Sequence, residues 1–221
     1  LNNKMFNKNI DIRNFKKVHR VIKVFKPDFI FHLAAEAIVT RAYKNPKNTW
    51  ETNTMGTLNI LESLKDYNKK VTVIMITSDK VYKNVETNKG YKEEDVLGNL
   101  DPYSASKASA DLVCQSYFNS QLRYKKNIKL GIARAGNVIG GGDWSDNRII
   151  PDCVKSWSKN KKVNIRSPHS TRPWQHVLDV LNGYLMFAEK LSSSKHLNGQ
   201  IFNFGPNKSE NKKVIDVVKS F

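Results

Sequence analysis

Tyr103 and Lys107 are the two side chains of this 221-residue sequence that are best suited to moving a proton. They stand four residues apart in the segment Tyr-Ser-Ala-Ser-Lys, directly after Asp101 and Pro102. On a helix, that spacing places both side chains on one face, about one turn apart. An ammonium group beside a phenol favours the phenolate and lowers its pKa from about 10. The pair therefore predicts proton transfer to and from a hydroxyl during an oxidation, although an ordinary surface pair has the same spacing.

A hydroxyl, a carboxylate and an amine follow one another at Ser78, Asp79 and Lys80, directly after the apolar run 71–77. In an open parallel sheet, the carboxyl ends of the strands face the ligand crevice. We therefore expect these three side chains to face the tyrosine–lysine helix and to supply further proton-transfer steps. For Asp79 and Lys80 taken alone, a solvated turn between strand and loop is an equally good interpretation.

Strands and helices that alternate along the chain would bring these residues together. Residues 29–33 are apolar on both faces, as in a buried parallel strand, and residues 71–77 are rich in β-branched side chains. The predicted strands are 29–33, 71–77, 128–133, 163–166 and 200–204. The predicted helices are 15–25, 49–67, 103–124, 150–158 and 178–191, with a last one beginning within 212–221. This alternation predicts an α/β fold with a doubly wound parallel sheet.

The glycine-rich phosphate turn of an α/β nucleotide-binding fold is absent from the sequence. Neither G-x-G-x-x-G nor G-x-x-G-x-x-G occurs, and Gly140–Gly142 comes late in the chain and lacks the Lys-Ser/Thr of a phosphate loop. We interpret that triplet as a flexible turn and the chain as a fragment cut at both ends. The predicted division is a truncated nucleotide-binding domain at 1–140 and a truncated substrate lobe at 141–221, interleaved with the last strand of the sheet.

The sequence is strongly basic, with 37 Lys and Arg against 20 Asp and Glu, a net charge of 37 − 20 = +17 and a pI near 9.8. Such a charge is typical of proteins that bind nucleic acid. Only 8 of the 37 basic residues are Arg, however, and the lysines occur as short pairs along the whole chain. Because nucleic-acid sites rely on arginine and on interleaved aromatic residues, we predict a solvated lysine-rich surface and no nucleic-acid partner.

Other functional classes are disfavoured by the cysteines and by the apolar runs. Cys114 and Cys153 cannot form a disulfide framework and have no metal-ligand spacing, so no metal site is predicted. The first residues lack a signal-peptide pattern, and no run approaches the roughly 18 apolar residues of a membrane span. The sequence therefore predicts a cytoplasmic protein with reduced thiols and no membrane partner.

Six segments of the sequence carry a resemblance to a known family. They are Phe31–Ala35, Asn53–Thr57, Thr77–Tyr82, Tyr103–Lys107, Ala135–Trp144 and Thr171–Val177. In order and spacing they resemble the extended short-chain dehydrogenase/reductase family that acts on nucleotide sugars. The last two segments are long and specific, and they resemble its CDP-glucose dehydratase branch. The resemblance covers nearly the whole chain and implies a Rossmann-like NAD-binding fold.

The resemblance implies that the cofactor is NAD and that a defined set of residues contacts it. Asp11 and Ile12 would meet the adenosine half, small alanines after the first predicted strand would allow close approach, and Lys107 would hold the nicotinamide ribose. The residues expected to contact NAD are Asp11, Ile12, Leu33, Ala34, Ala35, Asn53, Tyr103 and Lys107.

For the reaction, the resemblance implies an NAD-dependent hydro-lyase that removes water from CDP-glucose. Tyr103 would take the proton of the sugar 4-hydroxyl, and Ser78 would hydrogen-bond the same hydroxyl. Asp79 would protonate the departing 6-hydroxyl, and Lys80 would remove the proton from carbon 5. The related TDP-glucose dehydratases have Asp-Glu where this chain has Asp-Lys. A lysine acts as a base only when its pKa falls well below about 10.4, so the base at carbon 5 stays open.

The resemblance also assigns residues to the nucleotide-sugar substrate. Asn137 and Arg172 would hold the diphosphate, Arg148 would join them, and His176 lies in the same motif as Arg172. An arginine fork suits a diphosphate better than lysine does, although a surface salt bridge is the competing interpretation for Arg172.

Three further expectations depend on the resemblance. An epimerase or a reductase of the same superfamily is the main alternative activity, and an inactive fragment with an incomplete cofactor pocket is another. A homo-oligomer, dimer or tetramer, is expected to form through the helices predicted at 49–67 and 103–124. The branch further implies deoxysugar biosynthesis for O-antigen lipopolysaccharide.

Overall fold

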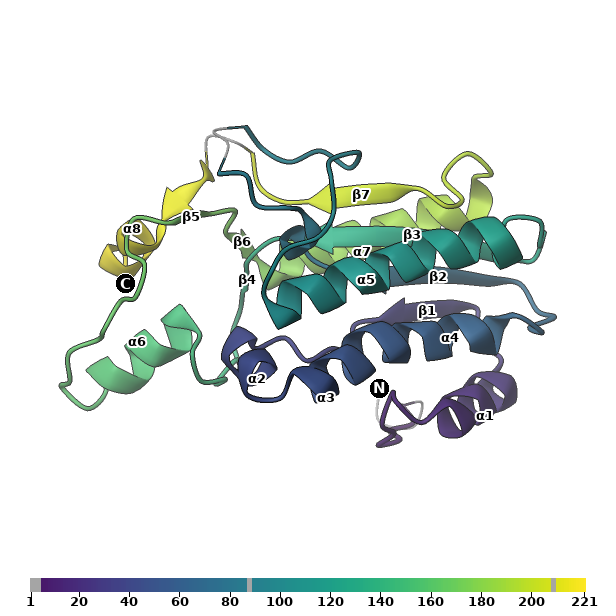
Figure 1. Ribbon diagram of the computed structural model, residues 1–221, viewed down its shortest axis with the longest axis horizontal. Helices are drawn as coiled ribbons and strands as arrows, with labels where there is room; N and C mark the ends of the chain where they lie inside the picture. Colours follow the sequence, from purple (N-terminus) through teal and green to yellow (C-terminus); the bar gives the residue numbers. More distant parts are fainter. Residues whose placement is uncertain (1–4, 87–88, 208–209) are drawn as a thin grey trace.

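A four-stranded parallel sheet forms the centre of the computed structural model, which describes residues 5–86, 89–207 and 210–221 (Figure 1). In sheet order, the strands are β1 (Phe29–His32), β2 (Val71–Ile76), β3 (Ile128–Ala135) and β7 (Ile201–Phe204). All three pairings are parallel. The doubly wound α/β fold predicted from the sequence is therefore confirmed, and these four strands lie within two residues of their predicted bounds.

Helices cover both faces of this sheet. One face carries α1 (Phe15–Phe25), α4 (Gly56–Leu64) and α5 (Pro102–Tyr117), and the other carries α7 (Val177–Ser193), which lies behind the strands in Figure 1. Successive residues of β2 alternate between the two cores, as the pleat of a strand requires. Val73 and Met75 belong to the cluster that contains Leu61 of α4, whereas Ile74 belongs to the cluster that contains Val180 of α7.

Helix α5 begins at a signal that the sequence displays. The Asp101 side chain accepts a hydrogen bond from the Ser104 backbone N–H over 3.0 Å, and Pro102 occupies the first helical position, where its missing N–H costs nothing. This start places Tyr103 in the first turn of the helix and Lys107 one turn later. The cap therefore sets the position of the predicted catalytic pair.

Two helices that the sequence predicts as continuous are interrupted by π-helical turns. The predicted helix 49–67 consists of α3 (Pro46–Trp50), the π-helix η1 (Glu51–Met55) and α4. The predicted helix 103–124 consists of α5 and the π-helix η3 (Phe118–Leu122). Single π-turns inside helices occur frequently at functional sites, and η1 carries Asn53.

A smaller lobe follows β3 and lies at one end of the sheet (Figure 1). Its elements are β4 (Val138–Ile139), α6 (Ile149–Trp157), β5 (Thr171–Arg172), β6 (Gln175–His176), β8 (Lys212–Lys213) and α8 (Val214–Lys219). The predicted strand at 163–166 is wrong. No backbone partner pairs with that segment in the described part of the chain, and Val163 and Ile165 instead pack against Cys153 and Val214. Helix α2 (Val39–Lys44) was not predicted.

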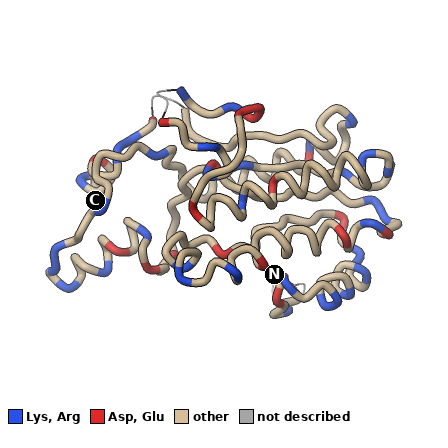
Figure 2. Tube along the Cα trace, viewed as in Figure 1, with Lys and Arg blue, Asp and Glu red and all other residues tan. Residues whose placement is uncertain are grey.

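Basic residues are distributed over both the sheet region and the smaller lobe, with acidic residues between them (Figure 2). Within the ranges that the structure describes, no helix is long and apolar enough to cross a membrane. No cluster of three His, Cys, Asp or Glu side chains that could hold a metal ion occurs in those ranges either.

Candidate active site

The structure brings Ser78 and Tyr103 together at the carboxyl end of β2. Ser78 follows the strand and starts the short 3-10 helix η2 (Asp79–Val81), where its Oγ accepts from the Lys80 backbone N–H over 3.2 Å. The Tyr103 hydroxyl donates to the same Ser78 Oγ over 3.5 Å. A strand end and a helix start therefore hold the two hydroxyls in contact, as the sequence predicts.

Asp79 and Lys80 continue this line of polar contacts. Ser78 Oγ donates to Asp79 Oδ1 over 3.2 Å, and Lys80 Nζ lies 3.8 Å from Asp79 Oδ2. The Lys80 and Asp79 side chains are 36% and 28% exposed, so both can be reached from solvent. Phenol, hydroxyl, carboxylate and amine thus form one connected series that a bound hydroxyl compound could reach.

Tyr103 and Lys107, one turn apart on α5, make their hydrogen bonds to different partners. Burial raises the pKa of Tyr103, opposed by the hydrogen bond with Ser78 and by the charge of Arg148. Lys107 Nζ instead donates to the Ile76 carbonyl over 2.9 Å, so its ammonium points at the end of β2. That Lys107 lowers the pKa of Tyr103 stays a prediction.

Burial of Lys107 predicts a pH dependence of stability. Burial lowers its pKa from the ordinary 10.5 to about 8. Between pH 8 and 10.5 the unfolded chain binds a proton that the folded chain lacks, so raising the pH through this window stabilises the fold. We expect the free energy of unfolding of the wild type to rise relative to a Lys107→Met variant by about 3 kcal/mol across it.

Urea unfolding of both proteins at several pH values measures this difference, and subtracting the variant removes the titration of all other groups. Lys16→Met on the exposed side of α1 is the matched control, because its lysine is solvated in both states. If the free energies of unfolding of the wild type and Lys107→Met differ by the same amount at pH 7.5 and at pH 11, the prediction is contradicted.

Asn53 connects the loop after β1 to the catalytic turn of α5. Its amide nitrogen donates to Ser106 Oγ over 2.9 Å and to the Glu36 carbonyl over 3.1 Å, and its oxygen accepts from the Glu36 backbone N–H over 2.8 Å. Ser106 Oγ in turn donates to the Tyr103 carbonyl over 2.7 Å. Asn53 is thus fully engaged with protein. Ser106 is a site residue that sequence reasoning missed, although its place inside the Tyr-Ser-Ala-Ser-Lys segment could have indicated it.

His32 ends β1 beside this region and is buried. Its Nε2 lies 3.1 Å from Thr57 Oγ1 on α4, and burial together with the charge of Lys107 lowers its pKa to about 4. The imidazole is therefore neutral at physiological pH. Beyond it, Leu33 and Ala34 are exposed and Ala35 is half-buried at the open end of the strand, where the sequence predicts cofactor contacts.

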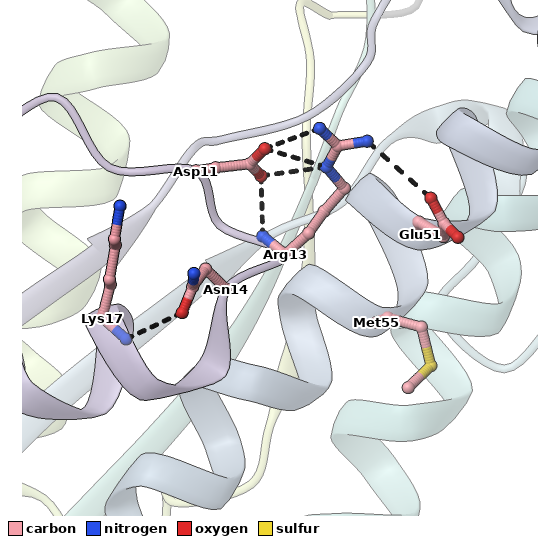
Figure 3. A pocket seen from close by; sticks show the side chains of 6 residues that line it. All are labelled: Asp11, Arg13, Asn14, Lys17, Glu51 and Met55. Atoms are coloured by element: carbon pink, nitrogen blue, oxygen red, sulfur yellow. Dashed lines mark hydrogen bonds and ion pairs between the residues drawn. The ribbon is translucent and has the colours of Figure 1, made fainter.

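Asp11 lies on an open cavity of about 610 Å³ (Figure 3). Its carboxylate is held by Arg13, with Nη2 and Oδ2 2.6 Å apart, and these hydrogen bonds lower the pKa of Asp11 to about 2. Ile12 instead turns toward the core and packs so closely on Gly56 that a Cβ at that glycine would stand 2.8 Å from Ile12 Cγ2. The residues that line the cavity are Asp11, Arg13, Asn14, Lys17, Glu51 and Met55.

Of the four predicted substrate residues, Arg148 is the one whose charge acts on Tyr103. Its Nε lies 3.3 Å from Asp143 Oδ2 without a hydrogen bond. That Nε is buried and has no hydrogen-bond partner. The Asn137 carbonyl accepts from the Gln175 N–H over 3.0 Å, which joins β4 to β6.

Arg172 and His176 lie in the smaller lobe. Arg172 stands directly opposite Lys212 in the antiparallel pair of β5 and β8. No ion pair connects either cation to a carboxylate among the residues that the structure describes. Like charges placed opposite each other destabilise a strand pair unless an anion lies between them. His176 is exposed, and its Nδ1 accepts from the Leu178 N–H over 3.3 Å at the start of α7.

Known proteins are similar to this chain in both sequence and fold. It is 43% identical over 212 residues to CDP-glucose 4,6-dehydratase of Salmonella typhimurium, covering 94% of this chain and 59% of that protein. It is 35% identical to CDP-paratose 2-epimerase of Salmonella typhi, covering 88% and 62%. The crystal structure of DesIV, a dTDP-glucose 4,6-dehydratase from Streptomyces venezuelae with NAD and TYD bound, is 25% identical with a TM-score of 0.79, covering 96% and 61%.

The chain thus spans about three fifths of the length of these relatives. Residues 2–205 match the sequence pattern of one family over most of the chain. The same residues include the Ser78–Lys80 turn, the Tyr103–Lys107 turn and the parallel sheet that holds them together. The chain belongs to the NAD dependent epimerase/dehydratase family.

Proposed function

We propose that this protein is a nucleotide-sugar 4,6-dehydratase that converts CDP-D-glucose to CDP-4-dehydro-6-deoxy-D-glucose with loss of water. The observation that carries the proposal is the connected series of Tyr103, Ser78, Asp79 and Lys80, which supplies a base for oxidation and an acid and a base for elimination. The 43% identity to a CDP-glucose 4,6-dehydratase supports the choice of sugar nucleotide.

NAD is the cofactor that the residues of this chain fit. Leu33 and Ala34 offer an exposed apolar surface at the carboxyl end of β1, where ligands bind in such sheets. Asp11 offers a carboxylate on an open cavity, and Lys107 offers an ammonium group beside the catalytic turn. Tyr103 completes the proposed set, and Asn53 would support it by holding the loop after β1 against the turn that carries Tyr103. Bound NAD would supply the redox chemistry of the reaction, taking a hydride from carbon 4 and returning it to carbon 6.

In the oxidation, Tyr103 accepts the proton of the sugar 4-hydroxyl. Ser78 Oγ already contacts the Tyr103 hydroxyl, so it can hydrogen-bond the same substrate oxygen and orient it. The charge of Arg148 favours the phenolate of Tyr103 against the effect of burial. The product of this step is a 4-keto sugar, whose carbonyl makes the proton on carbon 5 acidic.

In the elimination, Lys80 removes the proton from carbon 5 and Asp79 protonates the departing 6-hydroxyl, which leaves as water. This chemistry needs a neutral amine and a neutral acid. An ammonium–carboxylate pair carries the same total number of protons as an amine–acid pair. The 3.8 Å contact between Lys80 and Asp79 therefore lets one proton shift prepare the acid and the base together. The elimination itself leaves an ammonium and a carboxylate, which is the starting pair. The Lys80 ammonium can then return a proton to carbon 5 as carbon 6 is reduced, and the proton that Tyr103 accepted in the oxidation restores Lys80.

The diphosphate of the substrate is assigned to cations that lack a full set of protein partners. Arg148 has a buried Nε without a hydrogen-bond acceptor, and Arg172 faces Lys212 across a strand pair. A diphosphate beside Arg172 and Lys212 would relieve the repulsion between these two cations and accept charge-assisted hydrogen bonds. Asn137 and His176 lie on neighbouring segments of the same lobe and are proposed to contact the substrate.

An epimerase or a reductase of the same family remains the second candidate, supported by the 35% identity to CDP-paratose 2-epimerase. Those reactions need the Tyr103–Ser78 contact but no acid and base for the loss of water. The pairing of Asp79 with Lys80 directly beside Ser78 favours the dehydratase.

The test is incubation of the purified protein with NAD and, separately, CDP-, TDP-, UDP- and GDP-glucose. We expect a 4-keto-6-deoxy sugar from CDP-glucose, detected by mass spectrometry as the loss of 18 Da, which is the mass of one water. Turnover of TDP- or GDP-glucose without turnover of CDP-glucose would overturn the substrate. Epimerised product of unchanged mass would favour the second candidate.

We further propose a cytoplasmic enzyme of deoxysugar biosynthesis for O-antigen lipopolysaccharide. The two free and buried thiols, Cys114 and Cys153, support a reducing compartment. A homo-oligomer through α4 and α5 is supported by Leu112, which is 53% exposed on α5. Val113 and Tyr117, on the same helix, instead pack against the core.

A further inference from the structure

Asp111 and Arg134 form a fully buried ion pair behind the proposed catalytic residues. Their side chains are 0% and 1% exposed, and two parallel hydrogen bonds join them. Arg134 Nη2 donates to Asp111 Oδ1 over 2.8 Å, and Nε donates to Oδ2 over 2.9 Å. Apolar side chains of similar volume often stabilise a fold as well as such a pair does, so stability alone does not explain its presence. None of the steps proposed above uses either residue.

On one side, Asp111 fixes the start of the Ser78–Lys80 turn to α5. Asp111 lies one turn after Lys107 on that helix, and its Oδ2 accepts from Thr77 Oγ1 over 2.9 Å. Thr77 is the residue directly before Ser78, and its backbone N–H donates to the Ala133 carbonyl over 2.8 Å. The helix that carries Tyr103 is therefore attached to the strand end that carries Ser78.

On the other side, Arg134 fixes the end of the same turn. Its Nη1 donates to the Tyr82 hydroxyl over 2.8 Å and to the Glu93 carbonyl over 2.9 Å, and its guanidinium lies 4.9 Å from the centre of the Tyr82 ring. Tyr82 directly follows η2, and its hydroxyl donates to Asn203 Oδ1 on β7 over 2.6 Å. Tyr82 also stacks on Tyr91, with ring centroids 5.0 Å apart.

The segment with Ser78, Asp79 and Lys80 is thus held at both ends by one ion pair. A bidentate arginine–carboxylate contact fixes both distance and angle, whereas apolar contacts allow side chains to slide. A displacement of about 1 Å in a reacting group can cost about 100-fold in rate. The position of this segment relative to Tyr103 therefore affects the reaction rate more than it affects the stability of the fold.

We propose that Asp111 and Arg134 are positioning residues that hold the Ser78–Lys80 turn in register with Tyr103. The proposal rests on the proposed dehydratase function, because it assigns the reacting groups that need this register. Neither residue contacts the proposed substrate, so the ion pair would govern the chemical steps and leave substrate binding nearly unchanged.

The test is the double variant Asp111→Leu/Arg134→Met, which replaces the pair with apolar side chains of similar length. We expect a thermal midpoint within a few degrees of the wild type, a kcat for CDP-glucose lowered about 100-fold and a KM changed less than about 3-fold. Hydrogen exchange followed by mass spectrometry is expected to show faster exchange of the amides of residues 78–82. A folded double variant with a kcat within 3-fold of the wild type would overturn the proposal.

Two milder variants keep the proposal testable if the double variant fails to fold. Thr77→Val removes only the link to Asp111, and Tyr82→Phe removes only the hydroxyl that meets Arg134 and Asn203. Each is expected to lower kcat about 10-fold at unchanged KM. Unchanged kcat in both folded variants would overturn the proposal.

Leu191→Ala is the control for lost stability. Leu191 is fully buried on α7, which covers the opposite face of the sheet. Its truncation should lower the thermal midpoint while kcat at a temperature well below that midpoint stays within 2-fold. An equal fall of kcat in this control would assign the effect to stability and overturn the proposal. If the wild type lacks dehydratase activity, the proposed function fails, and the exchange of residues 78–82 still reports on the positioning.

Discussion

Replacing Tyr103 by phenylalanine is expected to lower the turnover of CDP-glucose by about 1,000-fold or more. The hydroxyl of Tyr103 is the proposed acceptor of the 4-hydroxyl proton, and a positioned acid–base group contributes about 100- to 10,000-fold to a rate. The phenyl ring keeps the packing of the tyrosine, so the thermal midpoint should stay within a few degrees. Affinity for CDP-glucose, measured by calorimetric titration in the presence of NAD, should change less than about 3-fold, because only one hydrogen bond is lost.

Two comparisons sharpen this expectation. Tyr124→Phe removes a hydroxyl from a side chain that is 79% exposed and lies beyond the end of α5, and it should leave turnover unchanged. Ser78→Ala removes the hydroxyl that contacts Tyr103 and should have a smaller effect than Tyr103→Phe, because the proton acceptor is still present. Turnover of Tyr103→Phe above a tenth of the wild-type rate would remove Tyr103 from its proposed role.

The parallel sheet could be predicted because its strands are short apolar runs that are buried on both faces. Val73, Ile74 and Met75 are all buried, and such runs are typical of strands covered by helices on both sides. The segment 163–166 (Val-Asn-Ile-Arg) also contains β-branched residues but forms no strand. Its apolar side chains find a core in the smaller lobe, while no partner strand lies beside its backbone in the described part of the chain. Pairing is a tertiary property that a local pattern does not contain.

The contacts of the candidate site were harder to predict than its members. Four-residue spacing correctly places Tyr103 and Lys107 one turn apart on a single helix. The carbonyl that accepts the hydrogen bond from Lys107 Nζ belongs to Ile76, 31 positions earlier in the chain. The direction of the Lys107 side chain therefore depends on how α5 packs on β2. Asp111 and Arg134 are likewise 23 positions apart and on different elements. No local pattern marks them, and only the fold brings them together.

Replacing Lys80 by methionine is expected to stop the reaction after the first oxidation. Lys80 is the proposed base at carbon 5, and methionine has a similar length but no amine. In deuterated water, a functioning base exchanges the carbon 5 proton, so wild-type product should carry deuterium at that position. The variant should oxidise carbon 4 yet release sugar without deuterium at carbon 5 and without loss of water. Mass spectrometry of the recovered sugar nucleotide measures both.

Lys83→Met is the matched control for this variant, because Lys83 is an exposed lysine three residues further along the same segment. It should incorporate deuterium and lose water at the wild-type rate. Asp79→Asn removes both the acid and the group that takes the proton of Lys80, so exchange at carbon 5 and loss of the 6-hydroxyl should both slow about 100-fold or more. Normal deuterium incorporation by Lys80→Met would assign the base to another group, and the contact of Lys80 with Asp79 would then serve only to orient the acid.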